Sequence, residues 1–173
     1  MKRIHLFIVL AAVLLSGCAA AQPERLVVND VVETFPAGTV KYTISVSLPE
    51  GMTEAVYGGS SDKRMYESAD GTYFVITEVL PRCSAEDAIR QMTGYKAEDL
   101  GMICTRNMSM PEYRFSWCTD GEHGMLTCTG IVVEDAAFCY CLSFCADEQQ
   151  AKNCAAARDQ VMSGFGLYCD EGF

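Results

Sequence analysis

Cysteine is the residue type in this chain with the widest chemical range, because its thiol can bind metals, act as a nucleophile or form disulfides. The chain has 10 cysteines and two histidines among 173 residues. Cys139, Cys141 and Cys145 are separated by even numbers of residues, so we expect them on one face of a strand. Together with Cys154 on the next element, they form a candidate thiolate site for zinc, an iron–sulfur cluster or redox chemistry.

The spacing of these cysteines also fits a simpler interpretation. Structural zinc sites favour cysteine pairs on tight turns, whereas an extended strand holds Cys139 and Cys141 about 6.6 Å apart. The sequence contains no Cys-x-x-Cys pair, which thioredoxin-like chemistry uses. In the alternative, the cysteines are small, buried apolar side chains under the C-terminal helix. We favour this alternative and expect no metal and no cofactor.

Cys118 and Cys128 form a candidate disulfide. Each lies five positions from His123, at the tip of a predicted hairpin, so in a symmetric hairpin the two cysteines face each other. Directly opposed residues of an antiparallel pair have Cα atoms about 4.5–5.5 Å apart, which a disulfide can bridge. A register shift of one residue would instead place the two side chains on opposite faces.

Residues suited to hydrolysis are sparse. His123 would be the only histidine of the processed chain, and we expect it to be an exposed turn residue rather than part of a catalytic dyad. The sequence has no Gly-x-Ser-x-Gly nucleophile motif. Acidic residues occur at predicted helix starts and turns, where they cap and solvate the backbone. The sequence therefore indicates a protein that is not an enzyme.

The N-terminus predicts export and lipid anchoring. Lys2 and Arg3 precede an apolar run at residues 6–15, the layout of a secretory signal. Leu15-Ser16-Gly17-Cys18 then resembles the lipobox of bacterial lipoproteins. This resemblance implies that residues 1–17 are removed and that the Cys18 thiol carries a diacylglycerol, with several acyl chains giving a stable anchor. In the alternative, the protein is secreted and Cys18 is an ordinary cysteine.

The net negative charge of the chain argues against some classes of binding partner. The chain has 23 acidic against 13 basic residues and a net charge of −10, and the signal removes two further basic residues. Binding to nucleic acid depends on neutralising phosphates, so we expect none. An anionic lipid surface would repel the domain, so we expect membrane contact only through Cys18, with an unknown envelope protein or ligand as partner.

The expected location is extracytoplasmic. It is the cell surface of a one-membrane bacterium, or the periplasmic face of the outer membrane in a two-membrane one. In such a compartment cysteines usually pair, yet nine remain once Cys18 is acylated, so at least one is free or intermolecular.

The rest of the chain alternates between strand and helix patterns. Residues 18–25 form a short lipidated tether, and residues 26–173 are expected to form one domain. Period-two patterns predict strands at 42–48, 65–68, 72–79, 103–106, 113–119, 125–133 and 138–145. Helices are predicted from Ser84 to Gly94 and from Asp147 to Ser163. The sum is an α+β fold, with helices packed on an antiparallel sheet of about six or seven strands.

Two segments of the chain, together with the order of its predicted strands and helices, resemble a known family. The segment Leu48-Pro49-Glu50-Gly51-Met52, the central hairpins and the closing Ser163-Gly164-Phe165-Gly166-Leu167-Tyr168 resemble PsbP-like domains of small bacterial lipoproteins, over residues 39–168. The resemblance implies a PsbP-like sandwich. Because members of that fold are mostly non-enzymatic, it also implies a non-catalytic binding or assembly module of the envelope. The alternative is a thiol-dependent redox or metal-handling lipoprotein that uses the cysteines named above.

Overall fold

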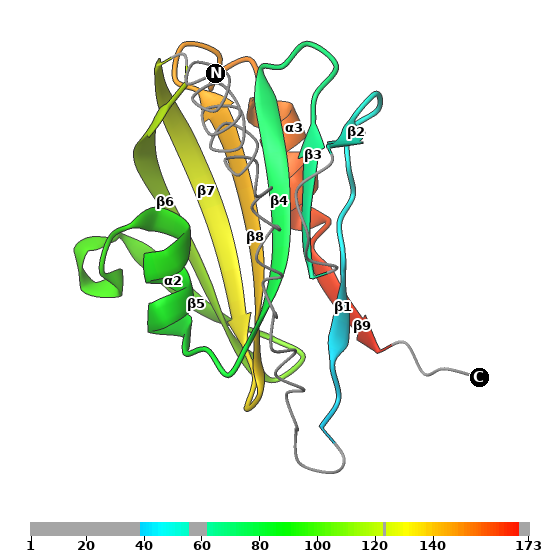
Figure 1. Ribbon diagram of the computed structural model, residues 1–173, viewed down its shortest axis with the longest axis vertical. Coiled ribbons are helices and arrows are strands. Elements are labelled where there is room, and N and C mark those ends of the chain that lie inside the picture. The colour runs from blue at the N-terminus through cyan, green and yellow to red at the C-terminus, as the bar shows by residue number, and fades with distance from the viewer. Residues whose placement is uncertain (1–38, 56–61, 123, 170–173) are drawn as a thin grey trace, which may run out of the picture. The chain divides into compact units, whose positions relative to one another are not determined.

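A seven-stranded antiparallel sheet forms the centre of the protein. The computed structural model describes residues 39–55, 62–122 and 124–169. The strands of the sheet lie in the order β2-β3-β4-β8-β7-β6-β5 (Figure 1). Their bounds are β2 Thr53–Ala55, β3 Lys63–Glu67, β4 Tyr73–Pro81, β5 Met102–Asn107, β6 Met110–Gly121, β7 Gly124–Glu134 and β8 Phe138–Asp147. The expected α+β class is confirmed.

The two edge strands of this sheet, β2 and β5, come from different parts of the chain. After β4 it passes through helix α2, Ala85–Thr93, and a short 3₁₀ helix, Ala97–Asp99, to the far edge at β5. It then returns through β6 and β7, so that β8 closes the sheet beside β4. Strands β5 to β8 thus form a meander, and its last strand, β8, is a central strand of the sheet.

The two faces of β8 carry different side chains. Nine of its ten residues are buried. Its aromatic and aliphatic residues pack in one core cluster with helix α3, Ala155–Ser163, whereas Cys139, Cys141 and Cys145 pack in a second cluster with α2. The predicted alternation of cysteines and bulky residues is thus confirmed, and Figure 1 shows the two helices on opposite sides of the sheet.

Local sequence signals explain α2. The Ser84 hydroxyl caps the helix by accepting a hydrogen bond from Asp87 N at 3.1 Å. The helix ends at Gly94, whose φ of 79° is the left-handed conformation that glycine adopts readily. The side chains of Ala85, Ala88 and Ile89 are buried against the sheet. The predicted helix is confirmed at both ends.

A two-stranded ribbon and α3 cover the face of the main sheet opposite α2. Strands β1, Tyr42–Ser45, and β9, Gly166–Cys169, pair with each other in antiparallel register. The buried Tyr140 hydroxyl of β8 fixes the ribbon, because it accepts a hydrogen bond from Tyr42 N at 3.1 Å and donates one to Asp135 Oδ2 at 3.1 Å. Burial is the main cause that raises the pKa of Tyr140, so its hydroxyl keeps its proton.

Three details of the predicted elements are wrong. The second helix begins at Ala155 rather than at Asp147, because β8 runs to Asp147 and turns occupy residues 148–154. The predicted strand over residues 42–48 does not join the main sheet but pairs with β9. The Asp120-Gly121 dipeptide, whose residue types predict a turn, is still paired within the strands of the β6–β7 hairpin.

Gly164 allows the chain after β1 to approach the end of α3. A Cβ atom at Gly164 would lie 2.4 Å from Ser47 Cβ and 2.9 Å from Ser47 N. We expect Gly164→Ala to lower the free energy of unfolding by about 1–3 kcal/mol, because backbone has to move. The control is Gly101→Ala, where a Cβ has no neighbour within 4 Å. Urea unfolding of both variants checks this, and equal midpoints would contradict it.

Candidate functional site

The cysteine face of β8 is a dry interior surface under α2. Cys139, Cys141 and Cys145 are exposed by 0%, 2% and 5%. The Cys139 thiol donates a hydrogen bond to the carbonyl oxygen of Cys83, just before α2, at 2.9 Å. The Cys145 thiol contacts that of Cys128 on β7. The side chains thus fill the core between sheet and helix, as the simpler interpretation expects.

The surroundings of these thiols oppose ionisation. Burial is the main cause that raises the pKa of Cys139, followed by the neighbouring Cys83 and Glu134. Burial likewise raises the pKa of Cys141. For Cys145 the contact with Cys128 contributes most, and burial adds to it. Metal binding and nucleophilic attack both need the thiolate, which these surroundings disfavour at all three positions.

Cys154 does not join the other three cysteines. It lies at the start of α3 and packs with Val161 and Phe165 in the cluster on the opposite face of the sheet. The expectation that Cys154 completes a thiolate site is therefore wrong, and the helix above the three cysteines is α2 rather than the C-terminal helix. Within residues 39–55, 62–122 and 124–169, no three His, Cys, Asp or Glu residues are grouped to hold a metal ion.

The geometry assumed for the Cys118 and Cys128 disulfide is also wrong. The hairpin pairs Cys118 with Thr127 and Trp117 with Cys128, one residue away from the symmetric register around His123. As a result, Cys118 is exposed while Cys128 is completely buried. His123 itself, and Cys18 with the signal and tether, lie outside the described residues.

A groove of about 600 Å³ lies where the β1–β9 ribbon meets strands β3 and β4. Its lining combines aliphatic residues of β1 and β4 with the rings of Tyr42, Tyr66 and Tyr168. Its volume lies within the range of about 300–1,000 Å³ that is typical of ligand sites. A smaller hollow of about 330 Å³ lies at Tyr95 and Cys118.

Charged side chains line the groove as well. Lys41 and Asp62 form an ion pair at 2.6 Å. The interaction with the Tyr66 side chain is the main cause that raises the pKa of the exposed Arg64 guanidinium. The groove therefore offers a permanently charged donor beside aromatic rings, an arrangement that can bind acidic or polar groups of a partner.

Reading the sequence did not find this groove. One of its walls is the β1–β9 ribbon, whose two strands are more than 120 residues apart in the sequence, since Tyr42 is paired with Cys169. The only local signal was the alternation of residues 42–48, which predicts a strand but not its partner. Pairing of distant strands depends on tertiary packing that local periodicity does not contain.

Comparison with known proteins supports the fold. No family model and no curated protein matches the chain. Its structure is similar to cyanobacterial PsbP from Synechocystis sp., with a TM-score of 0.52 and 10% identity, covering 80% of this chain and 99% of that one. The fold is therefore PsbP-like, as the sequence resemblance implied.

Two further solved structures have lower similarity. A protein from Bacteroides thetaiotaomicron aligns with a TM-score of 0.49 and 14% identity, covering 75% of this chain and 46% of that one. LpqN, which is involved in cell envelope biogenesis of Mycobacterium tuberculosis, aligns with a TM-score of 0.43 and 9% identity, covering 76% of this chain and 87% of that one.

The burial of the cysteines predicts their reactivity. In the reduced, folded protein at pH 8, we expect iodoacetamide to alkylate the exposed Cys104, Cys118 and Cys169 about 100-fold or more faster than Cys139 and Cys141, whose alkylation requires opening of the core. Time-resolved peptide mapping measures both rates, and a denatured sample serves as control. Rapid alkylation of Cys141 in the folded protein would instead indicate a reactive thiolate and revive the thiol-dependent alternative.

Proposed function

We propose that this chain is an exported lipoprotein whose PsbP-like domain is a non-catalytic binding or assembly module of the bacterial envelope. The N-terminal signal and the lipobox resemblance at Cys18 support export and anchoring. The groove between the β1–β9 ribbon and strands β3 and β4 is the observation that supports binding. The partner is an envelope protein or envelope component that enters this groove.

The chemistry of the groove is suited to a protein partner. Tyrosine and arginine are enriched at protein interfaces, because both combine apolar contact area with hydrogen-bonding groups. Here Arg64 and Tyr66 lie side by side on β3, and Tyr168 contributes from β9. A partner segment that carries a carboxylate or a phosphate could pair with Arg64 while its apolar part contacts the rings.

A lipid anchor attaches the domain to a membrane of the envelope. Among the described residues, no helix has the length and apolar character needed to cross a bilayer. A lipid on Cys18 supplies membrane attachment, and two or more acyl chains make such attachment stable. The acidic domain is repelled by anionic lipid and so remains available to a partner.

Substitution of Cys18 tests the anchor. We expect the full chain, expressed in a bacterial host with an alkyne-tagged palmitate, to carry the label and to sediment with membranes. Cys18→Ser should lose both properties, because no thioether can form. The matched control is Cys169→Ser, which removes an exposed cysteine of the folded domain. Equal labelling of the wild type and of Cys18→Ser would contradict the anchor.

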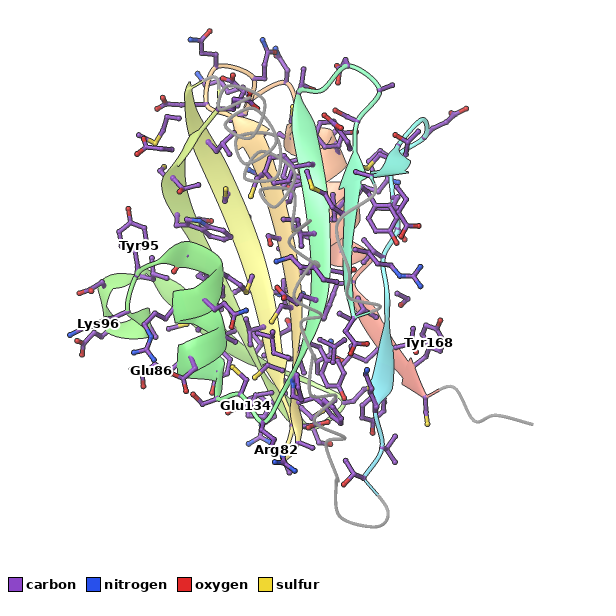
Figure 2. The ribbon with its side chains drawn as sticks, viewed as in Figure 1. Arg82, Glu86, Tyr95, Lys96, Glu134 and Tyr168 are labelled. Atoms are coloured by element: carbon purple, nitrogen blue, oxygen red, sulfur yellow. The ribbon has the colours of Figure 1, made fainter. Side chains whose placement is uncertain are left out.

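Site-specific photocrosslinking tests the groove. Tyr168 in the groove and Tyr95 beside the smaller hollow are each 47% exposed, and Figure 2 shows them on opposite sides of the molecule. We expect benzoylphenylalanine at Tyr168 to form a discrete adduct in intact envelopes, and the same probe at Tyr95 to form none.

A charge reversal makes this test specific. Arg64→Glu should abolish the Tyr168 adduct, because it removes the charged donor, whereas Glu98→Gln on the 3₁₀ helix should leave it unchanged. Adducts of equal intensity at both tyrosines, or an adduct that persists in Arg64→Glu, would contradict binding in the groove.

A further inference from the structure

The structure gives Cys128 a different partner from the one that the sequence suggested. In the ladder between β7 and β8, Cys128 is directly opposite Cys145. The other two cysteines of β8 have no cysteine opposite them, since Cys139 is paired with Glu134 and Cys141 with Val132 on β7. Cys128 and Cys145 are therefore a matched pair of thiols on neighbouring strands.

The backbone hydrogen bonds show which kind of pair this is. At one end of the ladder Asp135 N donates to Phe138 O at 3.0 Å, and at the other Glu148 N donates to Met125 O at 2.9 Å. Hydrogen-bonded and non-hydrogen-bonded pairs alternate along an antiparallel ladder. The register between these two bonds is unbroken, and Cys128 is an odd number of positions from each end. The Cys128–Cys145 pair is therefore non-hydrogen-bonded.

This position suits a disulfide. Cα atoms of a non-hydrogen-bonded pair are about 4.5 Å apart and their side chains are closest, whereas disulfides span Cα distances of about 4.4–6.8 Å. Both residues face α2 in the same core cluster, with exposures of 0% and 5%, and they are direct partners in the β7–β8 ladder. Bridging them requires no change of strand register.

We propose that Cys128 and Cys145 form a disulfide that joins β7 to β8 beneath α2, made by thiol–disulfide exchange with a protein or small-molecule disulfide outside the cytoplasm. Each cysteine loses its S–H bond and one S–S bond forms between them. The two electrons and two protons reduce the donor disulfide to two thiols. The structure holds the reduced form of the pair.

The inference rests on the export that the proposed function includes, because disulfides persist in oxidising compartments. Since both sulfurs are inaccessible once α2 has packed, exchange takes place while the chain folds after export. The bridge closes a short loop around the turn between β7 and β8. Four of the remaining cysteines, Cys83, Cys139, Cys141 and Cys154, then stay as apolar core or near-core residues.

Peptide mapping of the full chain tests the proposal. The exported protein is denatured in N-ethylmaleimide without reductant and cleaved with glutamyl endopeptidase. Cleavage after Glu122, Glu134 and Glu148 separates Cys128, alone in residues 123–134, from the three cysteines of residues 135–148. We expect these two peptides to be joined, with N-ethylmaleimide on Cys139 and Cys141 and two hydrogens fewer than the separate peptides carrying the same two adducts, and to separate after reduction. Alkylated Cys128 would overturn the proposal.

Two variants decide which cysteine of β8 takes part. Cys145→Ala should eliminate the joined peptide, whereas Cys141→Ala, an equally buried neighbour on the same face, should retain it. A joined peptide that persists in Cys145→Ala would overturn the assignment. If a variant fails to fold, the peptide map of the wild type still tests whether Cys128 is bridged.

A refolding arm separates this proposal from export itself. The same full chain is reduced in denaturant and refolded with oxidised and reduced glutathione, which requires no export. A bridged pair in this arm supports the geometry even if the exported chain retains its signal and the proposed function fails. Free Cys128 in both arms overturns the disulfide and leaves anchoring untouched.

Trp117 provides an independent readout. It is the only tryptophan of the chain and lies opposite Cys128 on β6, on the same buried face. Because a disulfide quenches a neighbouring indole, we expect reduction to increase Trp117 fluorescence and to lower Tm by roughly 5–10 °C. Neither change should occur in Cys145→Ala, and an equal change there would count against the bridge.

Discussion

The structure depends on the burial of β8 on both faces. A strand in an antiparallel sheet usually has one face in water, but nine of the ten residues of β8 are buried. Each face therefore needs its own cover. Helix α2 packs over the cysteines, while α3 and the β1–β9 ribbon pack over the aromatic residues. The insertion of β8 between β4 and β7 makes this double burial possible, because it places the last strand of the meander at the centre.

The two covers differ in what they leave at the surface. On the α2 side, the thiols pack with aliphatic side chains and with Phe115 and Trp117 in an interior where burial raises the pKa of Cys139 and Cys141. On the other side, a ribbon tied to β8 through Tyr140 leaves a groove against β3 and β4. The groove is edged by tyrosines and an arginine, and it lies on the opposite side of the sheet from the face rich in cysteine. The surface proposed for binding is thus separated in space from the cysteine core.

The cysteines show how strongly environment decides chemistry. The same residue type is exposed at Cys104, Cys118 and Cys169 and buried in β8. In the interior a thiol behaves as a small apolar group unless another thiol lies opposite it. Only the pairing of two strands creates that second situation, and it does so at Cys128 and Cys145. A cysteine-rich sequence can therefore form a core in which most thiols pack as apolar side chains and one opposed pair is placed where a disulfide can form.

The sequence by itself determined the local features: the Ser84 cap and Gly94 end of α2 and the alternation along β8. These depend on neighbours within a few residues, and the resemblance to PsbP-like domains added the overall architecture. Tertiary structure alone decided the β1–β9 pairing, the face that receives Cys154 and the register of the β6–β7 hairpin. A one-residue shift in that register costs little in local pattern but reverses the face of every side chain, and it places Trp117 rather than Cys118 opposite Cys128. The groove belongs to the same category, because one of its walls is a ribbon of two strands from opposite ends of the domain, which only tertiary packing brings against β3 and β4.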